Sequence, residues 1–440
     1  MCGAPRMPRG VHCTLVGALG YTGVNPWYKN LLKIQKHHPR PCRRLEIEKL
    51  DPMSLDFDSA QLPNPNLTDL HHAWREQLRR FIDVEIMPYA DDWDEAGEIP
   101  IGLWPKAAEV GLLGLSYPEA YGGTPGDVWL GQITAEELGR VGAGGINASL
   151  MVHNIGLPPI INWGSQTMKD AIAPPILRGE AWISLGITEP GGGSDVANLQ
   201  TTAVRDGDDY VVNGSKTYIT GGMRANWVST AVRTGGEGAG GVSMLLIPTD
   251  AEGFSRTPLN RKQGWWASDT ATLYFDNVRV PATQLIGQEN QGFRVIMTNF
   301  NSERMGMAIH MEAAARVCME EAVSWARERK TFGKRLGDHQ VIRHKIAMMK
   351  QKINATQAYI RVCNESIERG EPNPADIALL KVQASEVMEF CAREAMQVLG
   401  GLGFMRGSRT ERIYREVRVN AIGGGSEEIM RDLASRQYGL

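Results

Sequence analysis

The segment LGITEPGGGSDV, from Leu185 to Val196, is where the pattern of the chain changes. A short apolar run leads into a proline and three consecutive glycines, followed by a serine and an aspartate. Because glycine lacks a Cβ atom, backbone N–H groups in such a turn can come close to a flat ring or a phosphate. A glycine-rich turn between strands is more often only a turn, so its meaning depends on what surrounds it.

The apolar residues on the two sides of this segment have different spacings. Residues 69–179 carry them at steps of three and four, which indicates helices. Residues 181–292 carry them at steps of two, which indicates strands, including a hairpin DDYVVNGSKTYIT with Asn213–Gly214 as its turn. Trp265 and Trp266 are expected in the core of this domain, and the alternative is that they shape a partner surface or the pocket. Helical spacing then returns in two long runs, the second ending at Gly400–Gly401.

We therefore expect an α+β multidomain protein. Its parts are an N-terminal extension at residues 1–60, a helical domain at 61–180, a β domain at 181–292 and a helical bundle at 293–440. The extension is expected to be disordered or removed, because its first 45 residues contain basic residues but no Asp or Glu. Such a segment is compatible with a mitochondrial transit peptide. The alternative is an upstream extension before a start at Met53, in a cytoplasmic protein.

The composition argues against several classes of protein. Hydrophobic residues make up 42% of the chain, charged residues 22%, and the formal net charge is -3. That balance gives no general attraction to nucleic acid or anionic membrane, and no stretch approaches the roughly 18 to 20 apolar residues of a membrane helix. The six cysteines lack the spacing of metal ligands, so we expect free thiols, no metal site and a reducing compartment.

Three further segments could carry chemistry. Tyr218–Ile219–Thr220 ends a predicted strand and would present a ring and a hydroxyl at the rim of the sheet, although a strand aromatic is usually core. The segment ARERKTFGKRLGDHQ, residues 326–340, could neutralise a pyrophosphate, although a charged helix end is more often only solvated. Gln397 precedes LGGLGF, which could be no more than a glycine cap.

Together these segments resemble the acyl-CoA dehydrogenase family. TEPGGGSD, YITGG with ANW, RKTFGK with HQ, and QVLGGLGF occur in the order and spacing of that family over residues 67–440. The resemblance implies a helical N-terminal domain, a central β-barrel-like domain and a C-terminal four-helix bundle. It also implies a homotetramer that binds FAD at subunit interfaces, oxidises an acyl-CoA substrate and passes electrons to electron-transferring flavoprotein.

The resemblance also assigns residues to the cofactor and the substrate. Those implied to line the flavin ring are Leu185, Ile187, Thr188, Gly193, Ser194, Tyr218, Ile219 and Thr220. Those implied to hold the pyrophosphate and adenine half, largely of a neighbouring subunit, are Arg329, Thr331, Phe332, His339, Gln340, Gln397, Gly400 and Gly401, with Ser426 and Glu428 also assigned to the cofactor. Substrate contacts are expected from Ser194, Phe300 and Arg304.

The catalytic base is where the chain departs from the commonest family pattern. Many members have a Tyr-Glu-Gly-Thr turn before the last helix, and the position of that glutamate here is Gly424. Glu427 and Glu428 follow the turn, but acids there commonly serve the first turn of the next helix. The segment FNSERMGMAIH instead resembles isovaleryl- and long-chain acyl-CoA dehydrogenases, in which a Glu-Arg pair on a C-terminal-domain helix contains the base. That residue is Glu303.

The position of Glu303 within its helix supports this assignment. It follows Phe300 by three residues and precedes Met307 by four, so it lies within an apolar stripe. Desolvation of an inward carboxylate raises its pKa, which suits a group that takes a proton and later releases it. The alternative is a partly exposed glutamate paired with Arg304.

Gly424 carries two further expectations. The resemblance implies that its N–H, together with a hydroxyl of FAD, stabilises the charge that develops on the thioester oxygen during catalysis. Glycine in place of glutamate also removes bulk beside the substrate, so we expect branched or bulky acyl groups to be accepted.

Two other functions fit the same pattern less well. An acyl-CoA oxidase or a flavin monooxygenase of the same fold would use oxygen in place of an electron-transferring partner. A DNA-associated flavoprotein relative would add a basic C-terminal extension, whereas this sequence ends at RDLASRQYGL.

Overall fold

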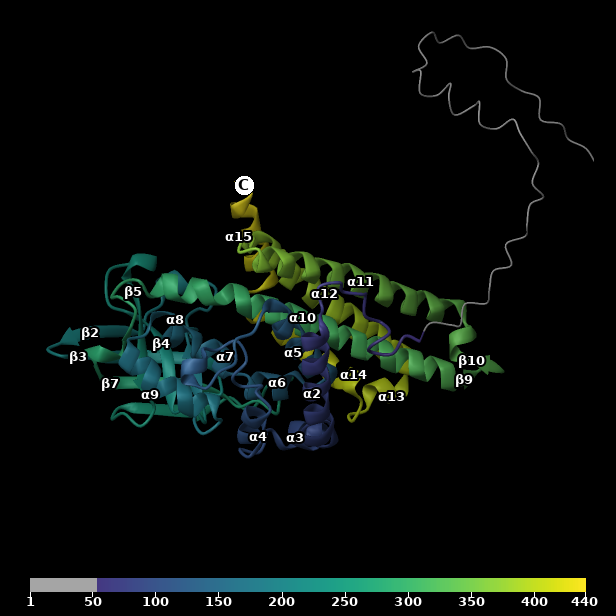
Figure 1. Ribbon diagram of the computed structural model, residues 1–440, viewed down its shortest axis with the longest axis horizontal. Helices are drawn as coiled ribbons and strands as arrows, with labels where there is room; N and C mark the ends of the chain where they lie inside the picture. Colours follow the sequence, from purple (N-terminus) through teal and green to yellow (C-terminus); the bar gives the residue numbers. More distant parts are fainter. Residues whose placement is uncertain (1–53) are drawn as a thin grey trace, which may run out of the picture. The chain divides into compact units, whose positions relative to one another are not determined.

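The first part of the chain folds into helices, some of which begin at polar caps. The computed structural model describes residues 54–440 (Figure 1). Asp127 shows the local cause, because its carboxylate accepts the N–H groups of Trp129 and Leu130 at the start of a helix. The helices are α2 (Asp69–Glu85), α3 (Ala90–Ala96), α4 (Leu103–Glu109), α5 (Val128–Arg140), α6 (Gly144–Leu150), α7 (His153–Gly156), α8 (Pro158–Trp163) and α9 (Gln166–Leu177).

The central part is an eight-stranded sheet in the order β6-β7-β3-β2-β4-β5-β8, with β1 paired to β4. Its strands are β1 (Ile183–Gly186), β2 (Thr202–Asp206), β3 (Asp209–Thr220), β4 (Trp227–Arg233), β5 (Val242–Pro248), β6 (Phe254–Pro258), β7 (Thr270–Pro281) and β8 (Leu285–Ile286). Most pairs are antiparallel, but β1 runs parallel to β4. The end of β1 therefore carries the chain into the glycine-rich segment at the margin of the sheet.

The predicted turn at Asn213–Gly214 is wrong. These two residues lie inside the continuous strand β3, and the hairpin turn falls earlier, between β2 and β3, where Gly207 has φ +62°. Gly214 has φ +142° and marks a register shift against β7. A β-bulge and a turn both favour the backbone conformations that glycine adopts easily, so the local sequence did not distinguish between them.

The C-terminal part is a bundle of long helices. Its elements are α10 (Gly292–Glu328), β9 (Lys330–Thr331), β10 (Lys334–Arg335), α11 (Gln340–Glu368), α12 (Pro374–Leu399), α13 (Gly401–Phe404), α14 (Arg409–Ile422) and α15 (Glu427–Gln437). Buried alanines on α10 and α12, among them Ala314 and Ala392, let these two helices pack closely. None of the helices in the described part of the chain is both long and apolar enough to cross a membrane.

The expected extension of residues 1–60 reaches too far. Phe57 and Ala60 are buried in the core of the bundle, and the guanidinium of Arg316 lies 4.0 Å from the Phe57 ring. Arg316 also donates a hydrogen bond to the Phe57 carbonyl. Residues from Ser54 onward thus pack with the rest, while the predicted transit peptide lies outside the described residues.

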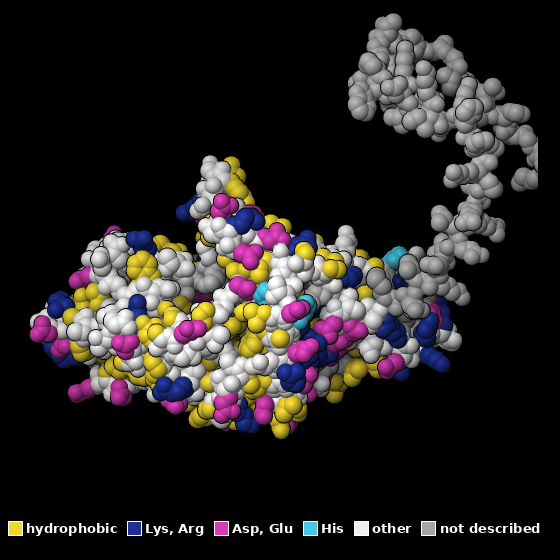
Figure 2. All heavy atoms as spheres, in the orientation of Figure 1, with side chains coloured by type: hydrophobic (Ala, Val, Ile, Leu, Met, Phe, Trp, Pro, Cys, Tyr) yellow, Lys and Arg dark blue, Asp and Glu magenta, His cyan; other side chains and the backbone are white. Residues whose placement is uncertain are grey.

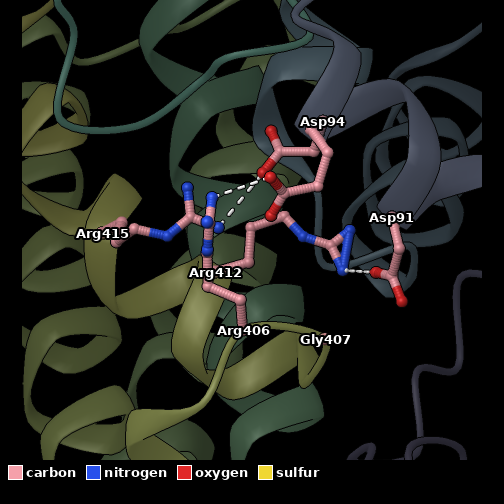
Figure 3. A pocket seen from close by; sticks show the side chains of 7 residues that line it. Asp91, Asp94, Arg406, Gly407, Arg412 and Arg415 are labelled. Carbon is pink, nitrogen blue, oxygen red and sulfur yellow. Dashed lines mark hydrogen bonds and ion pairs between the residues drawn. The ribbon is translucent and has the colours of Figure 1, made fainter.

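Three ion pairs join α3 to the segment that contains α14 (Figure 3). They are Asp91–Arg412, Asp94–Arg415 at 3.1 Å and Glu95–Arg406 at 2.7 Å. These residues line a cavity of about 230 Å³ that includes none of the residues assigned to the flavin or the substrate. Trp266 lies under Arg415, 3.9 Å from its guanidinium, so this residue belongs to the same contact and not to the core of the sheet.

Candidate functional site

The end of β1 lies beside the end of β3. Ser184 donates a side-chain hydrogen bond to the Thr220 carbonyl at 2.8 Å, and the Thr217 N–H donates to the Thr188 carbonyl at 2.8 Å. The structure therefore brings together two of the predicted segments, Leu185–Thr188 and Tyr218–Thr220. They are 30 residues apart in the sequence, and tertiary hydrogen bonds place them side by side.

The glycine-rich turn that follows β1 is closed by its own backbone. Glu189 and Gly192 exchange two backbone hydrogen bonds, of 3.0 and 3.1 Å. The Glu189 carboxylate accepts the N–H groups of Gln200 and Thr201 and pairs with Lys216 at 2.8 Å. This network anchors the turn, because three groups from other segments fix a single side chain.

Sequence reasoning missed both Glu189 and Lys216. Lys216 is fully buried, and burial lowers its pKa to about 8 while Glu189 opposes that change. The signal was available in strand β3, where Lys216 adjoins the buried positions Thr217 and Ile219. A buried ammonium needs a carboxylate partner, and Glu189 is the partner that the fold provides.

Tyr218 and Thr220 lie at the rim of the sheet. The Tyr218 side chain is 71% exposed, and its backbone has φ +60°, which is uncommon for a residue other than glycine. Ile219 between them is buried, whereas Gly193 and Ser194 in the nearby turn are exposed. A large exposed ring on a strained backbone is unusual for a strand, and it leaves a flat apolar surface for a ligand.

The second group of predicted residues lies at the far end of the bundle. The hairpin β9–β10 joins α10 to α11, and within it Thr331 bonds to His339 at 3.1 Å. Phe332 is 97% exposed at the tip, with its ring 6.1 Å from that of His339. The others of this group are exposed as well, and they are Arg329, Gln340, Gln397, Gly400 and Gly401.

One chain does not bring these two groups together. Glu303 lies on α10, and Arg329 is the C-terminal cap of the same helix. The two residues are 26 positions apart, which corresponds to about 39 Å along a helix. In Figure 1 the β9–β10 hairpin and the sheet lie at opposite ends of α10. The predicted flavin residues thus form two separate surfaces in one copy of the chain.

Glu303 faces the interior from the first third of α10. Its Oε1 accepts a hydrogen bond from Asn299 Nδ2 at 2.6 Å. Burial raises the pKa of Glu303 to about 8, although the neighbouring Arg304 acts in the opposite direction. A carboxyl group with this pKa can exchange a proton near neutral pH. Asn299 was missed by sequence reasoning, although it precedes Glu303 by one helical turn.

Phe300 links Glu303 to the flavin-ring segments. Its side chain packs in the same apolar cluster as Leu185 and Ile187. Glu303 follows Phe300 by three residues, about one turn of α10. The structure therefore places Phe300 in one apolar cluster with Leu185 and Ile187, and Glu303 one helical turn further along α10.

Arg304 points to the glycine turn between α14 and α15. Its side chain is buried, its Nε donates a hydrogen bond to the Gly424 carbonyl at 3.2 Å, and its guanidinium lies 5.2 Å from the Phe300 ring. A buried guanidinium in these contacts has little surface left for a ligand. The structure thus shows that Arg304 supports the glycine turn, and its predicted role toward the substrate stays a prediction.

The space beside Gly424 is already filled. A Cβ atom placed on Gly424 would lie 2.7 Å from the Met307 sulfur, closer than atoms can approach. The flexible thioether of Met307 takes the volume that glycine leaves here, and acceptance of branched or bulky acyl groups stays a prediction.

Ser426 and Glu428 begin the last helix. The Ser426 hydroxyl accepts the N–H of Ile429 and caps α15, and Glu428 is exposed in the first turn of that helix. Glu427 accepts a hydrogen bond from Ser385 at 2.7 Å. Neither acid lies among the contacts of Glu303, which agrees with a helix-start role for both.

Comparison with known proteins identifies the family. The acyl-CoA dehydrogenase N-terminal, middle and C-terminal domain profiles match residues 68–180, 184–278 and 290–439. This chain belongs to the acyl-CoA dehydrogenase family. The family and its three-domain fold were both predicted from the sequence and are confirmed, and the protein is an oxidoreductase.

Relatives in this family align along most of the chain. The long-chain specific acyl-CoA dehydrogenase of Rattus norvegicus mitochondria is 35% identical over 83% of this chain and 86% of its own. A probable acyl-CoA dehydrogenase of Mycobacterium abscessus is 45% identical, with a TM-score of 0.83 over 84% of this chain and 99% of its own. A glutaryl-CoA dehydrogenase of Mycobacterium smegmatis, solved with FADH2, is 26% identical, with a TM-score of 0.80 over 84% of this chain and 95% of its own. Family membership implies a flavin cofactor.

Proposed function

We propose that this protein is an FAD-dependent dehydrogenase that converts an acyl-CoA thioester to the trans-2-enoyl-CoA, with Glu303 as the base. The observation that carries the proposal is an inward carboxyl group with a pKa of about 8, on α10 between Phe300, which packs into the apolar cluster of Leu185 and Ile187, and Met307, which lies against Gly424. Such a group can remove a proton only if the substrate is held next to it.

Glu303 takes the proton from the α-carbon of the acyl group. The Asn299 amide holds one carboxylate oxygen at 2.6 Å, which orients the other toward the substrate. As the α-proton moves to Glu303, the electron pair forms the double bond to the β-carbon. The raised pKa lets the same group release the proton after the product leaves.

The Gly424 N–H stabilises the thioester oxygen. Within residues 54–440 this N–H is engaged in no backbone hydrogen bond, so it is free to donate to an acyl oxygen. Negative charge develops on that oxygen as the α-proton leaves, and a preorganised donor is most effective at that stage. Ser194, exposed in the glycine-rich turn, is the further substrate contact that we propose.

The chain offers suitable surfaces for FAD. The exposed rings of Tyr218 and Phe332 fit planar partners, with Thr188 and Thr220 beside the first and Arg329 and His339 beside the second. When bound, the flavin accepts the hydride that leaves the β-carbon. Because about 39 Å of α10 separates Glu303 from Arg329, we propose that a second copy contributes the second surface, within a homotetramer.

The decisive test is anaerobic reduction of the flavin by acyl-CoA. In Glu303→Gln the protein should retain its yellow flavin, while the rate of bleaching falls by about 10²- to 10⁴-fold. Glu427→Gln is the matched control, since it removes the neighbouring carboxylate on α15 and should bleach at the normal rate. Normal bleaching in Glu303→Gln would contradict the proposal.

The electron acceptor is the second part of the proposal. We propose electron-transferring flavoprotein, on the family likeness, and an acyl-CoA oxidase or flavin monooxygenase is the alternative. Reoxidation of the substrate-reduced protein should be much faster with electron-transferring flavoprotein than with air. Faster reoxidation by air would favour the alternative.

DNA association is the weakest alternative. The face drawn in Figure 2 interleaves Lys and Arg with Asp and Glu and shows no broad basic surface. Binding to DNA that weakens steeply with added salt would revive it.

A further inference from the structure

A buried lysine lies behind the glycine turn. Lys381 on α12 is 0% exposed, and its Nζ donates to the carbonyls of Ala421 at 3.1 Å and Gly425 at 2.8 Å. These carbonyls lie on the two sides of Gly424. The position of Lys381 in the sequence is typical of a core residue, four after the buried Ile377 and three before the buried Ala384.

The turn needs external support because of its composition. Gly423, Gly424 and Gly425 are consecutive, and the last two have φ of +67° and +101°. Glycine has the largest choice of backbone conformations, so a run of three has no side chain to define it. Lys381 holds the turn from α12, while Arg304 holds the Gly424 carbonyl from α10 at 3.2 Å.

Burial of this ammonium group requires an explanation. Removal of a charge from water is costly, and an apolar residue would fill the same place at a lower cost in folding free energy. Burial lowers the pKa of Lys381 to about 8. The charge of Glu427 acts to raise this pKa, and the charge of Arg304 acts to lower it further. Its two hydrogen bonds within the structure go to Ala421, in the last turn of α14, and to Gly425, in the glycine turn, so Lys381 ties the backbone before Gly424 to the backbone after it.

We propose that Lys381 is a positioning residue, which fixes the direction of the Gly424 N–H and thereby the polarisation of the thioester carbonyl. This rests on the proposed function. Lys381 itself touches neither substrate nor flavin, so its effect should appear in the strength of one hydrogen bond to the substrate. A merely structural lysine would affect stability alone.

The test measures the carbonyl stretch of a bound, ¹³C-labelled acyl-CoA thioester, together with kcat and KM. In Lys381→Met the stretch should move toward its value in free solution, and kcat should fall about tenfold, less than the 10²- to 10³-fold effect of deleting an oxyanion donor. Flavin content and KM should change little. Lys381→Arg, which keeps a cation with several donors, should recover part of both losses.

Lys350→Met is the matched control. Lys350 on α11 also donates to a backbone carbonyl, that of Ala60, but away from the turn. This variant should lose stability with a normal carbonyl stretch and normal kcat. If Lys381→Met does not fold, Lys381→Gln is measured in the same way.

Two results separate this inference from the proposed function. A normal stretch and a normal kcat in a folded Lys381→Met or Lys381→Gln would overturn the inference. Normal flavin bleaching in Glu303→Gln would overturn the proposed function, whatever Lys381 does.

Discussion

Glu303 and Gly424 lie in neighbouring segments of backbone that differ in kind. Glu303 is on α10, a helix of 37 residues whose packing orients its side chains. Gly424 lies in a run of three glycines that depends on Arg304 and Lys381 for its hydrogen bonds. A helix is therefore a suitable place for a base in this protein. At Gly424 a side chain would have to enter the space that Met307 occupies.

Moving the base to the turn should therefore fail. In Glu303→Gln/Gly424→Glu the new side chain meets the Met307 sulfur and requires a backbone with φ of +67°, so flavin bleaching should stay about 10²-fold or more below normal. Addition of Met307→Ala opens the space and should recover part of the rate. Anaerobic stopped-flow absorbance measures all three proteins. Full activity in the double variant would show that the turn accepts a side chain freely.

The pH dependence should follow the base on the helix. Because burial raises the pKa of Glu303 to about 8, the active carboxylate form increases with pH up to that value. The value of kcat/KM should therefore rise about tenfold per pH unit below pH 8 and level off above it. Initial rates between pH 5.5 and 9.5 test this. A flat curve over that range would mean that Glu303 is ionised throughout.

Met307 on α10 packs against the glycine turn at Gly424. Met307→Ala should raise kcat/KM for acyl groups branched at the α-carbon by about tenfold or more, because it removes the side chain that fills the space beside Gly424. The straight-chain substrate with the same number of carbons is the control and should change little. Equal changes for both substrates would place Met307 outside the acyl site.

The smallest expected effect is on stability. The pKa of Glu303 is about 8 in the folded protein, above its usual value of 4.5. The protonated carboxyl group therefore contributes to the free energy of unfolding in full below pH 4.5, and this contribution is lost as pH rises through 8. Glu303→Gln keeps a neutral side chain at every pH. Its Tm should exceed that of the unaltered protein by a few degrees at pH 9 and by less at pH 5. A constant difference would contradict the raised pKa.

The local sequence pattern was sufficient to predict a feature when that feature depends on a single helix or strand. Helical spacing and the apolar stripe around Glu303 predicted α10, and Gly400 was correctly placed at the end of α12. The Asn213–Gly214 pair was misread because a bulge and a turn both favour glycine. Phe57 was assigned to the extension because its burial depends on α10, which lies far along the chain.

The sequence by itself determined the family, the order of the domains and the candidate base, because ordered motifs and helical spacing are properties of the chain. Only the tertiary structure showed that Met307 fills the space at Gly424, that Arg304 supports the turn, and that Lys381 and Glu189 hold backbone segments in place. These contacts join residues from 11 to 120 positions apart. Hydrogen bonds and excluded volume act through distance in space, and no local pattern encodes which distant segments meet.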